Sequence, residues 1–355
     1  MKGNKKKYSI KLLVHQIMIK LKQKKFKKKR KDAKNKNIFF NYWKYYLIIS
    51  LIVIYIIINN SKGEVIKEVI KEEKEMQNKN VRVCLCSPGK KENKYIKEFV
   101  EHYKKYGVDK IYLYDNNDID GEHFEDIINN YVKSGFVEIV NFRGKIRALY
   151  PMMNDCYRNN YMKYDWLIFF EIDEYIHLKN KDVKTYLSDK CFNNCDIINL
   201  NWILHTDNNL IYYENKPLKE RFPEVEKKKN KLKSVKSILR GGIPNIKINC
   251  VHRLTGGLRN CDGFGRKSKA HGISTNNIDY TNYYIDHYAS KSTEEFANKM
   301  NKGDVLHMKD NIFDRINAYF VYNEVTKEKI DYFDKCIPGF NTSNVRNNLI
   351  SRIKS

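Results

Sequence analysis

The chain has 355 residues, 42% of them hydrophobic, and a formal net charge of +25 at neutral pH. This length allows one large domain or two small ones with a sizeable core. Residues 1–44 contain sixteen Lys, one Arg and one acid, and therefore carry +16 of the +25. The remaining chain is only mildly basic, so the total charge does not indicate a nucleic-acid-binding protein, and we expect no nucleic-acid partner.

An apolar segment without charged residues follows at 45–58. Counted from Ile38, with Lys44 reaching toward the interface, it attains the roughly 20 residues that a membrane-spanning helix needs. The alternatives are a buried core helix or a cleaved signal sequence. Because the basic side should stay cytoplasmic, we expect a tail (1–44), a transmembrane anchor (45–58) and a stalk (59–80) of a single-pass type II membrane protein. Its location would be the Golgi or secretory pathway in a eukaryotic cell, and the cell membrane otherwise.

Eight cysteines follow this segment: Cys84, Cys86, Cys156, Cys191, Cys195, Cys250, Cys261 and Cys336. None forms a C-x-x-C pair, which argues against a zinc site. If this part of the chain lies outside the cytoplasm, some of them should pair as disulfides, but the spacing does not give the connectivity.

Apolar strand-like runs alternate with amphipathic stretches of helical period. Strands are predicted at 81–88, 108–118, 136–142 and 165–173, and helices at 93–107, 121–135 and 150–164. The first helix should bury one face made of Tyr95, Ile96, Phe99, Val100 and Tyr103. This order predicts an α/β domain with a mainly parallel sheet covered on both faces.

Polar residues stand where three of these strands end. Ser87 ends the first strand, Asp115 and Asn116 end the second, and Glu171 and Asp173 end the fourth. Because ligands bind outside the carboxyl ends of strands in such sheets, we expect these residues to border one crevice.

The spacing of Glu171 and Asp173 suits a hard divalent cation, Mn²⁺ or Mg²⁺, which prefers oxygen ligands. Such a cation would bridge the phosphates of a bound nucleotide. An acid-x-acid triplet alone is a weak signal, since acids are common at solvated strand ends. In an extended segment side chains alternate, so Glu174 should point away from Glu171 and Asp173.

Five segments are similar, in the same order, to glycosyltransferase family 92 and related bacterial GT-A glycosyltransferases of the glycosyltransferase family 2-like superfamily. They are "ENKYIKEFVEHYKKYGVDKIYLYDNND", "MNDCYRNN", "DWLIFFEIDEYI", "LKSVKSILR" and "IDHYASKSTEEFANKMNKGD". The resemblance implies a GT-A domain (81–310) before a helical extension (311–355). It also implies metal-dependent transfer of a sugar from a nucleotide-sugar donor to a glycan or another hydroxyl acceptor. The sugar that the family suggests is galactose. Glu171 stands where the family usually has Asp, so direct metal coordination is assigned more firmly to Asp173.

The resemblance implies further site residues. Many GT-A enzymes complete the metal site with a late His, and His287 in "IDHYASKS" matches it; a core His is the alternative. Lys291 follows within reach of a diphosphate. The expected donor-binding residues are Ser87, Glu92, Asp115, Asn116 and Lys291.

Inverting transfer needs a carboxylate that deprotonates the acceptor hydroxyl. Asp207 and Asp262 are the candidates, with Asp207 slightly favoured because it follows Trp202, a possible platform for a sugar ring. The sequence decides neither between them nor between inversion and retention. The basic segment around Lys236 and Arg240 could hold a diphosphate or an anionic acceptor, or form a solvated strand face.

Two other functions stay open. A nucleotidyltransferase or phosphotransferase would also place acids at strand ends, but the chain has no G-x-x-x-x-G-K-[ST] loop. A carbohydrate-binding membrane protein without catalysis would be compatible with Glu171 in place of Asp.

Overall fold

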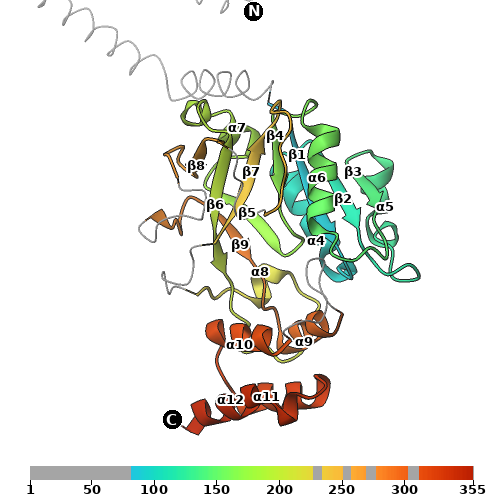
Figure 1. The fold of residues 1–355 in the computed structure, drawn as a ribbon, viewed down its shortest axis with the longest axis vertical. Helices are drawn as coiled ribbons and strands as arrows, with labels where there is room; N and C mark the ends of the chain where they lie inside the picture. The colour runs from blue at the N-terminus through green and yellow to red at the C-terminus, as the bar shows by residue number, and fades with distance from the viewer. Residues whose placement is uncertain (1–80, 227–233, 251–256, 269–276, 303–311, 355) are drawn as a thin grey trace, which may run out of the picture. The chain divides into compact units, whose positions relative to one another are not determined.

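The computed structural model describes residues 81–354 except 227–233, 251–256, 269–276 and 303–311 (Figure 1). The predicted tail, anchor and stalk thus lie outside the described residues. Within the part of the chain that the structure describes, no helix is both long and apolar enough to cross a membrane.

The strands form one curled sheet in the order β3-β2-β1-β4-β7-β6-β9-β5, with β8 paired to β6. Their bounds are β1 (Val83–Gly89), β2 (Lys110–Asp115), β3 (Val137–Asn141), β4 (Trp166–Phe169), β5 (Glu174–Leu178), β6 (Ile197–Leu204), β7 (Val235–Arg240), β8 (Asn260–Asp262) and β9 (Tyr283–His287). The first four strands are parallel, as predicted. Beyond β4 the sheet is mixed, because β7 runs antiparallel to both β4 and β6, and β5 runs antiparallel to β9.

The helices are α4 (Asn93–Lys105), α5 (Glu125–Lys133), α6 (Leu149–Asn160), α7 (Val183–Leu187), α8 (Leu218–Arg221), α9 (Thr293–Lys302), α10 (Ile312–Tyr322), α11 (Lys327–Cys336) and α12 (Asn344–Lys354), with short 3₁₀ helices η1 (Lys190–Phe192) and η4 (Phe340–Thr342). The predicted face of α4 is buried in full. A helix of this length is stabilised mainly by packing of such a face.

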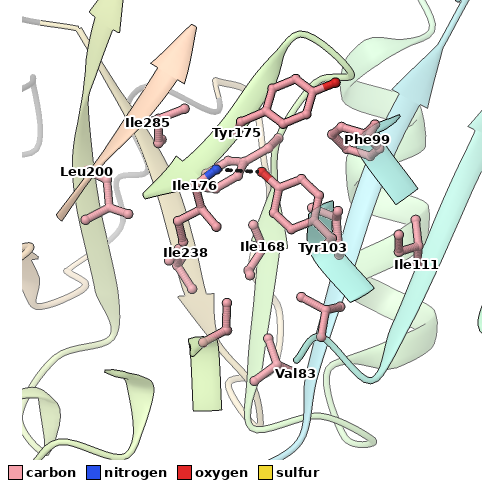
Figure 2. Packing of buried hydrophobic residues seen from close by; sticks show 14 of the residues in the cluster. Val83, Phe99, Tyr103, Ile111, Ile168, Tyr175, Ile176, Leu200, Ile238 and Ile285 are labelled. Carbon is pink, nitrogen blue, oxygen red and sulfur yellow. Dashed lines mark hydrogen bonds between the residues drawn. The ribbon is translucent and has the colours of Figure 1, made fainter. Parts of the chain in front are cut away.

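Both faces of the sheet are covered. Successive side chains of a strand point to opposite faces, so alternate residues of β1 enter different cores. Val83 and Leu85 of β1 join the core that contains Phe99 of α4 (Figure 2). Cys84 and Cys86 join a second core with α6, which crosses in front of β1 and β2 in Figure 1. Burial of a side chain as large as Phe99 contributes about 1.5–3 kcal/mol.

A third core lies among α9, α10, α11 and α12. It contains Phe296 and Met300 of α9 together with residues of the predicted extension. A buried ion pair ties these helices to the loop after β6, since Nζ of Lys329 lies 2.6 Å from Oδ2 of Asp207.

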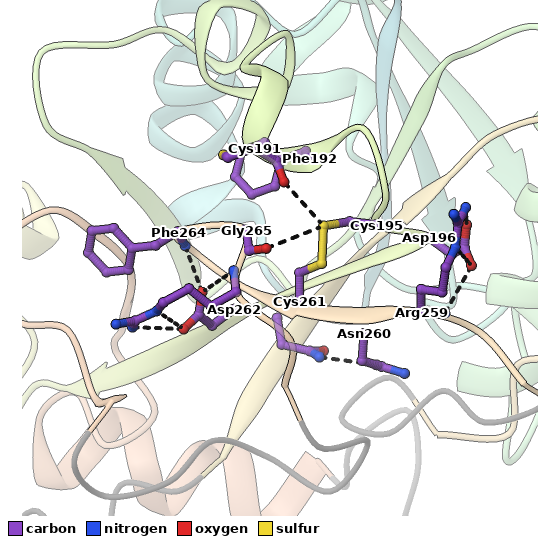
Figure 3. Close-up of a disulfide and its surroundings, with 12 residues drawn as sticks. Cys191, Phe192, Cys195, Asp196, Arg259, Asn260, Cys261, Asp262, Phe264 and Gly265 are labelled. Atoms are coloured by element: carbon purple, nitrogen blue, oxygen red, sulfur yellow. Dashed lines mark hydrogen bonds and ion pairs between the residues drawn. A yellow bond between two sulfur atoms is a disulfide. The ribbon is translucent and has the colours of Figure 1, made fainter.

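Two disulfides join elements that are distant in the sequence. Cys86–Cys156 links β1 to α6, and Cys195–Cys261 links the segment before β6 to β8 (Figure 3). They span 70 and 66 residues of sequence. Disulfides of this kind form and persist in oxidising compartments.

The fourth strand ends earlier than the sequence predicted. β4 stops at Phe169, a turn follows at Ile172 and Asp173, and β5 begins at Glu174. The backbone N–H of Glu171 donates to Oε2 of Glu174 (3.0 Å), so the chain has reversed by this point. The prediction that Glu174 points away from Glu171 is therefore wrong, because it assumed an extended segment.

Candidate active site

Three carboxylates gather in this reversal, which we call the acid turn (Glu171, Asp173 and Glu174). Lys236 of β7 reaches it from beside β4, with a side chain that is 0% exposed. Its Nζ lies 2.5 Å from Oε1 of Glu171 and 3.3 Å from Oε1 of Glu174. Burial by itself would raise the pKa of Glu171, but the charge of Lys236 outweighs it, and the pKa of this carboxyl lies below its ordinary range.

The acid turn packs against the end of β1 at Gly89. A Cβ atom at this position would lie 2.6 Å from the ring of Phe124 and 2.8 Å from Ile172. A side chain at position 89 would have to displace Phe124 and Ile172, so glycine at the end of β1 lets the turn pack closely against this strand.

His287 faces the acid turn from the end of β9. Its Nε2 lies 3.7 Å from Oδ1 of Asp173 and 3.9 Å from Oε1 of Glu174, and its ring packs against Trp202 at 4.3 Å between centroids. Burial lowers the pKa of His287 to about 4, so the ring is neutral at physiological pH. Its Nδ1 has no hydrogen-bond partner among the described residues. With the proton on Nδ1, Nε2 presents its lone pair toward Asp173.

Lys299 of α9 binds the other oxygen of Asp173, with 2.8 Å between Nζ and Oδ2. Burial opposes ionisation of Asp173, but the charge of Lys299 and the nearby His287 and Lys291 hold its pKa well below the ordinary range. Asp173 is therefore a carboxylate at any physiological pH.

Glu174 differs from its two neighbours. Burial raises its pKa to about 8, repulsion from Glu171 and Asp173 adds to the shift, and Lys236 opposes it. The acid turn therefore holds a proton on Glu174 for much of the time near neutral pH, while Asp173 remains charged.

A pocket of about 400 Å³ opens beside Asp173. It is lined by Lys91, Glu92, Lys94, Tyr95, Ala289, Ser290, Lys291, Glu295, Asn298, Lys299 and Asn301. The ammonium of Lys291 lies 3.7 Å from the centre of the Tyr95 ring and 3.4 Å from Oε2 of Glu92. Four lysines and two acids give the pocket a positive balance, which suits an anionic ligand.

The other predicted donor-side residues are held inside the fold. Ser87 is 0% exposed, and its Oγ has no partner among the described residues. Asp115 forms a 2.6 Å ion pair with Arg143, and the amide of Asn116 donates to the carbonyl groups of Phe142 and Lys145. Asp115 and Asn116 thus tie the loops after β2 and β3 together.

The two candidate bases are also bonded elsewhere. Asp207 is 2% exposed and accepts from the hydroxyl of Tyr319 (2.5 Å) besides its ion pair with Lys329. Asp262 accepts from the backbone N–H groups of Phe264 and Arg266 and pairs with the Arg266 guanidinium (Figure 3). The structure brings together Glu171, Asp173 and His287 at the acid turn, with Glu92 and Lys291 at the adjoining pocket.

Sequence reasoning missed Lys299 and the inward direction of Glu174. Lys299 stands in a segment whose family resemblance was noted, but only the packing of α9 shows that it reaches Asp173. Lys236 was identified as one residue of a basic segment, and its burial depends on β7 lying between β4 and β6.

Two side chains at this site, Asp173 and His287, have atoms placed to bind a divalent cation. Oδ1 of Asp173 and Nε2 of His287, 3.7 Å apart, can both bind one ion at about 2.1 Å. Across the described ranges, no three His, Cys, Asp or Glu side chains are grouped to hold a metal. Ions that bridge phosphates commonly take one or two protein ligands and complete their shell with water and phosphate oxygens. Asp173 and His287 supply such a pair, whereas Glu171 is bound to Lys236.

Comparison with solved structures finds distant likenesses. TarS of S. aureus, residues 1–349 in complex with UDP-GlcNAc, is 12% identical with a TM-score of 0.35, and the match covers 73% of this chain and 80% of that one. The longer TarS chain is 13% identical with a TM-score of 0.33, over 76% of this chain and 50% of that one, so this chain spans about half its length. The mannosyltransferase PcManGT of Pyrobaculum calidifontis, in complex with GDP-Man and Mn²⁺, is 10% identical with a TM-score of 0.27, over 37% and 42%.

No curated protein matches the chain. The sequence model of glycosyltransferase family 92, in contrast, matches residues 79–316, which is well over half of the chain. This range contains the acid turn, Lys236, His287 and Lys299, and the resemblance predicted from the five sequence segments is confirmed. The chain belongs to glycosyltransferase family 92.

Proposed function

We propose that this glycosyltransferase moves a sugar, galactose in the first place, from a nucleotide-sugar donor to a hydroxyl group of a glycan or another acceptor. The observation that carries the proposal is the meeting of Asp173 and His287 beside a cationic pocket. An ionised carboxylate and a neutral imidazole lie next to lysines that can bind phosphate oxygens. This arrangement suits the departure of a nucleoside diphosphate.

In the proposed reaction the acceptor oxygen bonds to the anomeric carbon as the bond from this carbon to the diphosphate breaks. Asp173 and His287 would hold Mn²⁺ or Mg²⁺, which neutralises charge on the leaving diphosphate when bound. Lys291, fixed over Tyr95 and beside Glu92, presents its ammonium to the phosphate oxygens. Trp202, packed on His287, covers the ring of the metal-binding imidazole. The acceptor proton needs a base, and Asp207 or Asp262 could serve only by leaving the bonds described above.

The proposed setting is a type II membrane protein with the catalytic domain on the far side of the membrane. The charge asymmetry around 45–58 supports this orientation. The two disulfides also support it, since such bonds form and persist in oxidising compartments.

The test is a screen of nucleotide-sugars for release of nucleoside diphosphate by the full chain in detergent, with Mn²⁺, with Mg²⁺ and with a chelator. We expect release from one donor, dependent on the cation and accelerated by acceptor. Binding of sugars without release from any donor would favour the non-catalytic carbohydrate-binding alternative.

A further inference from the structure

Lys299 takes part in two neighbouring sites. Its Nζ donates to Oδ2 of Asp173 (2.8 Å), and its side chain also lines the cationic pocket. It is 23% exposed, so its ammonium can turn from the carboxylate toward the pocket without unfolding α9. In contrast, Lys236 on the other side of the acid turn is completely buried between Glu171 and Glu174.

We propose that Lys299 is an exchangeable counter-ion: it neutralises Asp173 while the site is empty and passes to the diphosphate of the donor when donor and cation bind. This inference rests on the proposed function, since it concerns the cation and the diphosphate of that reaction. It assigns Lys299 the role of coupling the two binding events.

Electrostatic repulsion between the cation and Lys299 favours the departure of Lys299 from Asp173 when the cation binds. A divalent cation at Oδ1 of Asp173 and Nε2 of His287 would lie close to the Lys299 ammonium on the other carboxylate oxygen, and like charges at such distances repel strongly in a buried site. A cation arriving alone therefore competes with Lys299. A diphosphate in the pocket offers Lys299 new oxygen acceptors, and the departure of Lys299 leaves Asp173 to the cation.

The pocket wall contains a fixed lysine for comparison. Lys291 is 5% exposed and held by Glu92 and the Tyr95 ring. It can bind phosphate where it stands and does not gate Asp173. Coupling between cation and diphosphate is reciprocal, so each should raise the affinity for the other by the same factor, and Lys299 should account for part of that factor.

The experiment measures Mn²⁺ binding from the electron paramagnetic resonance signal of the free ion, with and without UDP or GDP, for the wild-type chain and three variants. Lys299→Met removes the ammonium, Lys299→Arg keeps a charge, and Lys94→Met is the control. Lys94 lines the same pocket, but its ammonium lies over the Tyr213 ring at 4.4 Å. Thermal melting of each variant confirms that the fold is retained.

Without nucleotide, Lys299→Met should bind Mn²⁺ about tenfold more tightly than the wild type, since a charge-assisted hydrogen bond to Asp173 no longer has to be broken. Without metal, the same variant should bind the nucleotide about tenfold more weakly. Lys299→Arg and Lys94→Met should keep the wild-type Mn²⁺ affinity within about twofold.

Wild-type Mn²⁺ affinity in Lys299→Met, in a chain that still binds nucleotide, would overturn the exchange while leaving the proposed function intact. An equal rise of Mn²⁺ affinity in Lys94→Met would also overturn it, because the loss of any positive charge in the pocket would then explain the effect. A wild-type chain that binds neither Mn²⁺ nor any nucleoside diphosphate would contradict the proposed function itself.

Discussion

Nε2 of His287 lies 3.7 Å from Oδ1 of Asp173, and the pairing of β5 with β9 brings them together. Glu174, the residue after Asp173, stands directly opposite His287 in this antiparallel pair. Backbone hydrogen bonds, rather than the geometry of a loop, therefore hold the imidazole at the carboxylate. A site built on paired strands is preorganised and tolerates few displacements.

Asp173→Asn should lower sugar transfer by about 10² or more, as is usual when an electrostatic stabiliser of a transition state is lost. The melting temperature should fall modestly, because the ionised Asp173 with its lowered pKa contributes stability that Asn lacks, whereas Lys299 is partly exposed and can turn to solvent. Donor turnover and thermal melting are measured together. Asp165→Asn, at the partly exposed residue before β4, is the matched control and should keep full activity. Full activity in Asp173→Asn would contradict its assignment to the metal site.

Lys236→Met should destabilise the domain by about 3 kcal/mol, because it leaves the completely buried Glu174 without its counter-ion, whereas Glu171 is 39% exposed and can be hydrated. Adding Glu174→Gln should restore part of this loss, since Gln replaces a buried acid with a neutral side chain of the same shape. Urea denaturation of the two single variants and the double variant measures the coupling. Strictly additive losses would show that Lys236 and Glu174 do not act as one network.

The buried pair of Asp207 and Lys329 gives a test of the catalytic base. Lys329→Met and Asp207→Asn should each cost about 3–5 kcal/mol of unfolding free energy. If the role of Asp207 is structural, turnover per folded molecule in Asp207→Asn should remain within about tenfold of the wild type. A loss of about 10³ or more in a fully folded Asp207→Asn would identify it as the base after all.

Acid should destabilise the domain through two buried histidines. Burial lowers the pKa of His102 and of His287 to about 4, whereas an unfolded chain has histidine pKa values of about 6.5. The neutral rings therefore contribute stability that is fully present above pH 6.5 and is lost as the pH falls toward 4, by up to about 1.4 kcal/mol per pH unit for each ring. Melting temperatures between pH 7 and 4 should show it. His102→Gln, which keeps a donor near the carbonyl of Ile176, should flatten the slope, and parallel curves would contradict the assignment.

A glycosylation sequon in the C-terminal part of the chain can test the proposed membrane orientation. Asn341 is exposed and begins the glycosylation sequon Asn341-Thr342-Ser343. Expressed in a eukaryotic secretory system, the full chain should carry a glycan there, and Asn341→Gln should remove the corresponding mass. Protease added to intact vesicles should spare the domain. An unmodified Asn341 in a domain that is digested from the cytoplasmic side would reverse the proposed topology.

Local sequence patterns predicted the first half of the fold. The helix α4 and its buried face followed from apolar residues at helical spacing, and β1 to β4 followed from short apolar runs between turn residues. The end of β4 could not be predicted in this way. The segment from Phe169 to Glu174 contains no Gly or Pro, and its reversal depends on β5 pairing with the distant β9.

The sequence predicted the acids and the histidine of the candidate site, but not the lysines that neutralise the acids. Glu171, Asp173 and His287 were identified because their residue types and the family resemblance mark metal ligands. The lysines that neutralise them come from β7 and α9, and an antiparallel strand inserted between β4 and β6 leaves no periodic signal in the sequence. Asp207 and Asp262 were chosen by residue type and, for Asp207, by its position after Trp202. The structure shows each carboxylate bound to basic and backbone groups.

The insertion of β7 between β4 and β6 also sets an order of events during synthesis. The acid turn leaves the ribosome well before Lys236, and Lys299 follows only after β9 and the start of α9. Until β7 has emerged, the three carboxylates at the edge of the early parallel strands have neither lysine partner, and Asp173 lacks Lys299 until α9 has emerged. The nascent chain must therefore keep this edge hydrated. Closure of the site should therefore coincide with the last long-range pairings, which are the slowest to form. A chain interrupted before α9 would be a folding intermediate with an open, acidic sheet edge.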